Sequence, residues 1–207
     1  RRQRQMCIRD RVNGAGGNSA KANTDKEFYE AGDVDNSLLQ TFFTISPENV
    51  SSVLDLNFLG TLIPTQVFAR QMLGRPGCNI INLSSMNAFT PLTKIPAYSG
   101  AKAAISNFTQ WLAVHFSKVG IRVNAIAPGY MATEMNTALL NDEGRNTEIL
   151  GRIPAHRWGT PDDMKGLCIF LASDASDYIA GAVIPCDGGY LLSLIHISEP
   201  TRRRGIS

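Results

Sequence analysis

Short apolar runs alternate with longer helical patterns along the middle of the chain, and this alternation constrains the fold more than any other feature. The runs "CNIINLSS" at 78–85 and "IRVNAIA" at 121–127 are apolar enough to be buried on both faces. Residues 47–73 and 98–118 predict long helices. Strands and helices in this order indicate an α/β fold, with right-handed crossovers and a parallel sheet that helices cover on both faces.

Turn residues mark where the predicted helices begin and end. Residues 46–48, "SPE", offer a capping hydroxyl, a proline for the first turn and an acid near the positive helix end. The sequence "TPDD" at 160–163 predicts another helix start, for a helix that runs to about Ser173. Gly120 is suited to close the helix over 98–118.

The remaining segments are predicted to be irregular, weakly helical or short strands. A first strand is expected to end near Val12, and a polar loop follows it to about Ser46. A loop with Pro91 and Pro96 precedes the helix over 98–118. Weak helical signals lie at 133–140 and 146–150, and a last strand is expected within 180–189.

Composition excludes several classes of function. The chain has 207 residues with 43% hydrophobic and 18% charged content, and it contains no apolar run of eighteen residues. We therefore expect a globular cytoplasmic protein without a membrane span. The four cysteines are scattered, form no CxxC and have no histidines clustered beside them, so neither a metal site nor a disulfide framework is predicted.

The net charge of +2 comes from the two ends of the chain. Residues 1–11 carry +4 and residues 193–207 carry +2, which leaves −4 for residues 12–192. A mildly acidic body offers no basic patch, so nucleic-acid binding is not predicted. The ends share no periodicity with the body, and they resemble translated sequencing-adapter read-through. We expect a native body at 12–192 within a longer gene; a genuine basic arm for an anionic partner is the alternative.

Three side chains in "SSMNAFTPLTKIPAYSGAK" suggest chemistry on a carbonyl or an alcohol. Tyr98 and Lys102 are four residues apart on a predicted helix, so they share a face. A nearby ammonium favours the phenolate and should lower the pKa of Tyr98 from about 10, which suits proton exchange. Ser85, at a predicted strand end, could hold the same substrate oxygen. A Tyr–Lys pair alone is weak evidence, because many solvated helix faces carry one.

Further motifs make residues 12–192 resemble the short-chain dehydrogenase/reductase family. The sequence "NGAG" at 13–16 stands where the family has "NNAG", so Gly14 is a departure, and "PGYMAT" at 128–133 matches PGxxxT. The resemblance implies the C-terminal part of a Rossmann-type doubly wound parallel sheet. It also implies NAD or NADP as cofactor. The implied catalytic residues are Asn57, Ser85, Tyr98 and Lys102. The implied cofactor-binding residues are Asn13, Ala15, Gly16, Tyr98, Lys102, Pro128, Gly129 and Thr133.

The resemblance also implies a mechanism. Hydride passes between the nicotinamide and a secondary alcohol or ketone, Tyr98 exchanges the proton and Ser85 orients the oxygen. Lys102 would lower the pKa of Tyr98 and hold the ribose, and Asn57 would position a water that links Lys102 to solvent. Helices near 47–73 and 98–118 form the dimer interface in this family, which implies a homo-oligomer.

Within the family, the sequence is most similar to the D-mannonate oxidoreductase (fructuronate reductase) branch, which implies a sugar-acid substrate. A carboxylate substrate requires a cation near the site. Candidate substrate residues are Asn87, Lys94, Arg152, His156 and Arg157. Exposed surface charges are the alternative explanation for the four basic residues. A gluconate-type or 3-oxoacyl reductase is the alternative within the enzyme class.

The family's phosphate-binding loop, TGxxxGxG, does not occur in the sequence. Three βα units, roughly ninety residues, are expected to precede Val12. Residues in these units would determine whether NAD or NADP binds. The chain as written is therefore predicted to be inactive and not to bind NADH. An inactive truncated fragment or a non-catalytic dimerisation module is the alternative to an enzyme.

Overall fold

Four parallel strands form the sheet. The computed structural model describes residues 9–193, so residues 1–8 and 194–207 of the two predicted tails lie outside the described residues. The strands are β1 (Asp10–Asn13), β2 (Asn79–Leu83), β3 (Arg122–Pro128) and β4 (Val183–Cys186), in the order β1-β2-β3-β4. Every neighbouring pair is parallel, which confirms the predicted sheet. β1 begins two residues before the expected start of the body at Val12.

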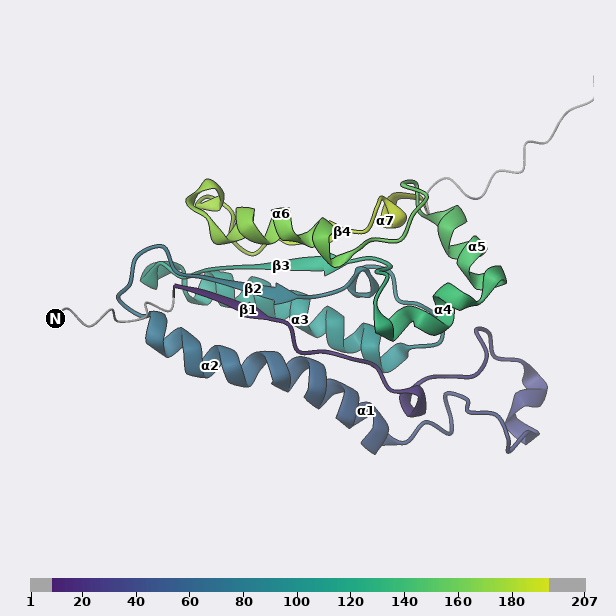
Figure 1. Ribbon diagram of the computed structural model, residues 1–207. Helices are drawn as coiled ribbons and strands as arrows, with labels where there is room; N and C mark the ends of the chain where they lie inside the picture. The colour runs from purple at the N-terminus through teal and green to yellow at the C-terminus, as the bar shows by residue number, and fades with distance from the viewer. Residues whose placement is uncertain (1–8, 194–207) are drawn as a thin grey trace, which may run out of the picture.

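Helices cover both faces of the sheet (Figure 1). Helices α2 (Gly60–Met72) and α3 (Pro96–His115) lie against one face, and α6 (Pro161–Ala172) lies against the other. The strand residues alternate accordingly: Ile80 and Val123 pack toward α2 and α3, whereas Ile81 and Ile126 pack with Leu171 of α6. Burial on both faces explains why β2 and β3 are apolar throughout.

The ends of α3 differ from the prediction for local reasons. Pro96, expected in a loop, lies in the first turn of α3, where its missing N–H leaves no hydrogen bond unmade. The helix ends at His115 rather than at 118, and a 3-10 turn, η5 (Ser117–Val119), follows. Gly120 closes this turn in the left-handed conformation, with φ 72.

The predicted helix over 47–73 is divided into three parts. Helix α1 (Pro47–Leu54) begins as predicted, with the Ser46 hydroxyl accepting a hydrogen bond from the Asn49 N–H. A π-helical turn, η3 (Asp55–Leu59), separates α1 from α2. Single π-helical turns inside α-helices occur frequently at functional sites.

Two irregular regions lie at the carboxyl ends of the strands (Figure 1). The first, which we call the β1–α1 segment, comprises residues 14–46 and contains the 3-10 turns η1 (Ala20–Ala22) and η2 (Ala31–Asp35). The second joins β3 to α6 and contains η6 (Glu134–Asn136), α4 (Thr137–Asn141) and α5 (Glu143–Arg152). Helix α5 begins before the weak signal at 146–150 because Asp142 caps it, accepting a hydrogen bond from the Arg145 N–H.

The C-terminal elements follow the prediction closely. Helix α6 begins with the capping box between Thr160 and Asp163. The short helix α7 (Tyr190–Ser193) follows β4. Between Arg9 and Ser193, no helix is long and apolar enough to cross a lipid bilayer.

Candidate active site

Ser85 and Tyr98 meet at the carboxyl end of β2. Ser85 caps the 3-10 turn η4 (Met86–Ala88), and its hydroxyl accepts a hydrogen bond from the Asn87 N–H at 3.2 Å. The loop from 89 to 95 brings the first turn of α3 back to this strand end. There the Ser85 side chain lies close enough to the Tyr98 phenol to influence its pKa as a hydrogen-bonding neighbour. A substrate oxygen could therefore be held by one hydroxyl while it exchanges a proton with the other.

Lys102 is buried one turn further along α3. Its ammonium donates a hydrogen bond to the Leu83 carbonyl oxygen at 2.9 Å and lies 5.6 Å from the centroid of the Tyr98 ring. The Ser84 hydroxyl in turn donates to the Lys102 carbonyl oxygen at 3.2 Å. These bonds fix the face of α3 that carries Tyr98 and Lys102 against the end of β2.

Asn57 lies in the π-helical turn and is fully buried. Its amide nitrogen donates to the carbonyl oxygens of Gly17, at 2.7 Å, and Val53, at 2.8 Å. Its side-chain oxygen accepts a hydrogen bond from the Gly17 N–H at 3.2 Å. Asn57 thus holds the chain that leaves β1 close to Lys102 of α3.

Gly16 is the point at which Asn57 and Lys102 converge. A Cβ atom at this position would lie 2.8 Å from Asn57 Oδ1 and 2.9 Å from Lys102 Nζ. Both distances are shorter than a side chain tolerates, so the arrangement requires glycine here. The family-derived expectation groups these three residues, and the geometry brings them together.

Burial controls the pKa values at the site. Burial lowers the pKa of the Lys102 ammonium to about 8, and the ammonium is still mostly protonated at neutral pH. Burial raises the pKa of Tyr98, and the hydrogen bond from Ser85 opposes this only in part. The expected lowering of the Tyr98 pKa by Lys102 is therefore wrong for this geometry, because the ammonium bonds to Leu83 rather than to the phenol. Tyr98 is a protonated donor at neutral pH.

The residues expected to bind a cofactor lie at the same edge of the sheet. Asn13 ends β1, but its side chain faces the core, where it donates to Thr65 Oγ1 and Asn82 Oδ1. Ala15 lies against Gly60, at which a Cβ atom would be 3.1 Å from the Ala15 Cβ. Any contact of Asn13 with a ligand must therefore come from its backbone.

The "PG" motif follows β3 beside β4. Pro128 ends β3, and the Gly129 N–H donates to the Cys186 carbonyl oxygen at 3.0 Å. A Cβ atom at Gly129 would lie 2.6 Å from the Cβ of Asp187, so the close approach of β4 requires glycine. Thr133 is exposed and directly precedes η6 as its N-cap residue.

The candidate substrate residues differ in their partners. Arg157 binds the Asp163 carboxylate through two hydrogen bonds, at 2.8 and 2.6 Å. Arg152 Nη2 lies 3.5 Å from Glu148 Oε1, and the neighbouring Tyr190 raises the pKa of the guanidinium.

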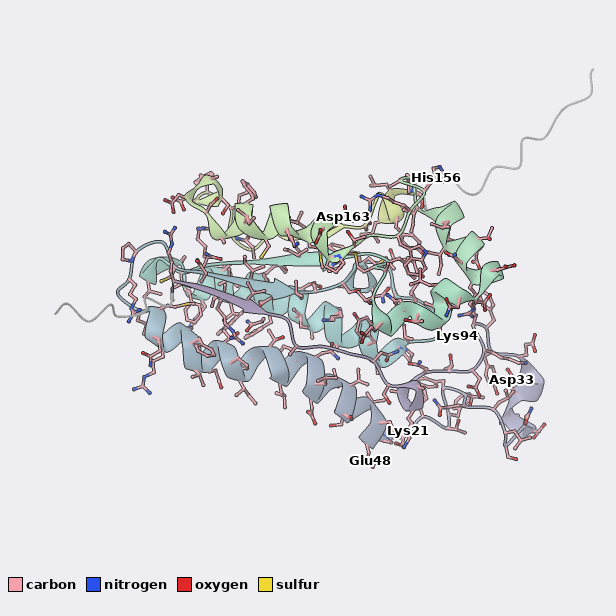
Figure 2. The ribbon with its side chains drawn as sticks, in the orientation of Figure 1. Lys21, Asp33, Glu48, Lys94, His156 and Asp163 are labelled. Carbon is pink, nitrogen blue, oxygen red and sulfur yellow. The ribbon has the colours of Figure 1, made fainter. Side chains whose placement is uncertain are left out.

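The other three candidates have no such partners. Lys94 is half-buried, precedes α3 and forms no ion pair within residues 9–193. Asn87 is buried, and its Oδ1 has no hydrogen-bond partner in the part of the chain that the structure describes. His156 is exposed and has a positive φ of 50 (Figure 2 labels Lys94 and His156).

An aromatic cluster beside the site was not predicted. The Tyr130 ring packs edge-on against Trp158, at 5.4 Å, and against Tyr190, at 5.3 Å between centroids. Met86, next to Ser85, belongs to the same buried cluster. The cluster joins the "PG" loop to α5 and α7. Its members are far apart in the sequence and share no periodicity, so no sequence signal could have found it.

A family model described as enoyl-(acyl carrier protein) reductase matches residues 25–191 of the chain. The chain belongs to the short-chain dehydrogenase/reductase family. The expected resemblance is thereby confirmed over most of the body. Structures of relatives with bound NAD or NADP agree with the cofactor class expected from the sequence.

Two relatives and one solved structure show which members of the family this chain is similar to. The chain is 56% identical over 185 residues to an uncharacterized oxidoreductase of Haemophilus influenzae, covering 86% of this chain and 64% of the relative. It is 45% identical over 147 residues to a 2-dehydro-3-deoxy-D-gluconate 5-dehydrogenase of Dickeya dadantii, covering 70% and 58%. A crystal structure of a putative D-mannonate oxidoreductase from Haemophilus influenza with bound NAD superposes with a TM-score of 0.82 at 53% identity, covering 88% and 66%. The chain therefore spans less than two thirds of the length of the two relatives.

Proposed function

We propose that the protein is an NAD- or NADP-dependent oxidoreductase acting on a sugar acid of the fructuronate/mannonate type. The observation that carries the proposal is the juxtaposition of Ser85 and Tyr98, with the buried Lys102 one helical turn away, at the carboxyl edge of a parallel sheet. Relatives named as sugar-acid dehydrogenases and reductases support the substrate class.

The chemistry of the donors at this edge fits the nicotinamide end of such a cofactor. The Lys102 ammonium and the Tyr98 hydroxyl are neighbouring donors that suit the two hydroxyls of a ribose. Gly16, Pro128 and Gly129 would lie along the same ligand. The bound cofactor supplies or accepts the hydride.

The protein's own residues then handle the proton. Tyr98, whose pKa is raised by burial, donates a proton to the carbonyl oxygen in the reducing direction. Ser85 holds that oxygen by a hydrogen bond. Lys102 keeps a positive charge beside the phenolate that is left, because its pKa of about 8 leaves it mostly protonated at neutral pH.

Lys94 is the best-placed cation for the substrate carboxylate. It lies four residues before Tyr98 and, among the residues that the structure describes, it has no carboxylate partner. Arg152 and Arg157 already bind Glu148 and Asp163. Asn87 Oδ1 is the natural acceptor for a substrate hydroxyl, because a buried acceptor without a partner is costly.

The direct test is turnover of D-mannonate and related sugar acids with NAD and with NADP. We expect turnover in the full-length protein, and loss of at least about 100-fold in kcat for Tyr98→Phe with nearly unchanged cofactor affinity. Tyr178→Phe, at a fully exposed tyrosine, is the matched control. Equal turnover in the two variants would remove Tyr98 from the proton-transfer role.

The second candidate function is that of a dimerisation module without catalytic activity. Apolar side chains are exposed along α1, η3, α2 and α3, on the helices expected to form a dimer interface. They include Leu54, Leu56, Leu59, Ile63, Val67, Trp111 and Val114. A fluorescence titration of the full-length protein with NADH separates the candidates, because saturable binding at micromolar NADH favours the enzyme.

A further inference from the structure

The β1–α1 segment is unusually long for a connection in a compact domain. Residues 14–46 contain no strand or α-helix. Irregular connections longer than about 15 residues are uncommon and are usually functional. The segment leaves the carboxyl end of β1, the edge at which parallel sheets bind ligands. Figure 1 shows it extending past the start of α1, below α4 and α5.

The root of the segment packs beside the proposed catalytic tyrosine. Ala22 is fully buried in a cluster with Val53 and Ala97, against which Tyr98 also packs. The Thr24 N–H donates to the Lys94 carbonyl oxygen at 2.9 Å. The segment therefore fixes the backbone of the residue that we assign to the substrate carboxylate.

The far side of the segment meets α5. Glu27 Oε1 lies 3.8 Å from Arg145 Nη2. Both side chains are about half exposed, so the pair contributes little stability, but it marks where the two regions come together. The segment and α5 thus flank the loop that carries Lys94 toward Tyr98.

Internal hydrogen bonds hold the segment in one shape. The Gln40 side-chain amide donates to the carbonyl oxygens of Ala20 and Asn23. The Gln40 N–H donates to Asp25 Oδ2 at 2.7 Å, and the Asp25 N–H donates back to the Gln40 carbonyl oxygen at 2.9 Å. These hydrogen bonds hold the segment in one defined conformation.

A cavity of about 220 Å³ lies between the segment and the loop before α3. Thr93 and Pro96 line it from the α3 side, and Asp25 and Glu27 line it from the segment. Thr41, also in the lining, is only 8% exposed. The rings that complete the lining belong to Phe28, Tyr29 and Phe42.

The charges in this lining are unbalanced. Lys26 is the basic residue there, and it is already bound to Asp33 and Glu30. Asp25 and Glu27 therefore add negative charge on the side of the segment that faces Thr93, the neighbour of Lys94, and the exposed Arg145 guanidinium 3.8 Å from Glu27 offsets only part of it. Hydroxyl groups would find hydrogen-bond acceptors here, whereas a second carboxylate would be repelled.

We propose that the β1–α1 segment is a specificity wall of the substrate site, which admits polyhydroxylated acids with one carboxylate and rejects diacids. The inference rests on the proposed function, because it takes Lys94 as the anchor of the single carboxylate. The segment selects among acid substrates, whereas the groups that react with the substrate are those of Ser85 and Tyr98.

The test compares a sugar monoacid with the diacid of the same chain length, D-mannonate and D-mannarate, in the full-length protein. We expect kcat/KM to favour the monoacid. Glu27→Gln and Asp25→Asn should each narrow that preference about fivefold, because each removes one repelling charge. Glu48→Gln, the same change at an exposed position in the first turn of α1 and outside the cavity lining (Figure 2), should leave it unaltered. An unchanged preference in both cavity variants overturns the proposal.

A second readout is independent of activity. Glu27→Arg should raise hydrogen exchange in 143–152, and adding Arg145→Glu should restore protection, because the reversed pair can form again. Reversing Asp162 and Lys165 on α6 is the matched control. If neither acid is turned over but Arg145→Glu still restores protection in the Glu27→Arg variant, the result counts against the proposed function alone. Absence of the coupling would count against the specificity wall.

Discussion

The ammonium of Lys102 is bonded to the carbonyl oxygen of Leu83, 2.9 Å away, at the last residue of β2. One buried cation is thus attached to the end of a central strand instead of pairing with a carboxylate. Burial lowers its pKa from 10.5 to about 8. The bond positions Lys102 beside Tyr98, and the lowered pKa makes the stability of the fold depend on pH.

This pKa shift predicts that stability rises at alkaline pH. Below the folded-state value of about 8 the ammonium is charged in both states, and its burial destabilises the fold. Between about pH 8 and 10.5 the unfolded chain binds more protons than the folded chain, so the free energy of unfolding increases with pH. Urea unfolding at about pH 7.5 and 9.5 should show a gain of about 2 kcal/mol from this group.

Lys102→Met isolates the contribution, because other groups titrate equally in both proteins. The difference in unfolding free energy between wild type and variant should shift by about 2 kcal/mol across the same interval. If the two proteins show the same pH dependence, the Lys102 pKa is not lowered in the folded state.

A second prediction concerns the convergence of Asn57 and Lys102 on Gly16. In Gly16→Ala the new methyl group would meet both side chains at less than 3 Å. Because Asn57 is held by three hydrogen bonds, Lys102 should move, and kcat should fall while the fold is retained. Gly14→Ala is the matched control, since its methyl group would lie 3.8 Å from Leu83 Cδ1, an ordinary contact. Equal kcat values for the two variants would contradict the predicted displacement.

The strand and helix order could be predicted because each element carries its own local signal. Buried parallel strands are apolar on both faces. Ser46 and Thr160 are capping residues, and such residues mark the start of a helix in the sequence. The π-helical turn at Asn57 could not be predicted, because one wider turn leaves helical spacing on both sides intact. The segment over 14–46 lacks periodicity, so its packing against α3 and α5 was also beyond prediction.

At the site, residue identity was more predictable than electrostatics. Ser85, Tyr98 and Lys102 follow from their spacing and from the family resemblance. The direction of the Tyr98 pKa shift depends on where the Lys102 ammonium points, and spacing does not determine that. The ion pairs of the basic candidate residues likewise depend on the tertiary structure. The sequence does not reveal that Asp163 binds Arg157, nor that Lys94 has no carboxylate partner in the described region.

Lys94, which has no carboxylate partner among residues 9–193, gives a third prediction. Lys94→Gln should raise KM for a sugar acid about tenfold and leave kcat nearly unchanged, because the lost contact is to a distant carboxylate rather than to the reacting carbon. Lys118→Gln, at an exposed lysine beyond the far end of α3, serves as the control. Cofactor affinity should not change in either variant. A fall in kcat with constant KM would place Lys94 in the chemical step instead.

The exposed apolar face of α2 and α3 gives the last prediction. Ile63 is 53% exposed and Trp111 is 55% exposed, although each is large and apolar. Contiguous apolar patches of this kind mark protein–protein contacts, so we expect the protein to associate with a second copy through this face. Ile63→Asp combined with Trp111→Ala should lower the sedimentation coefficient to that of a monomer. Val34→Asp, at an exposed valine of the β1–α1 segment, should not. Unchanged sedimentation in the double variant would show that α2 and α3 are not the interface.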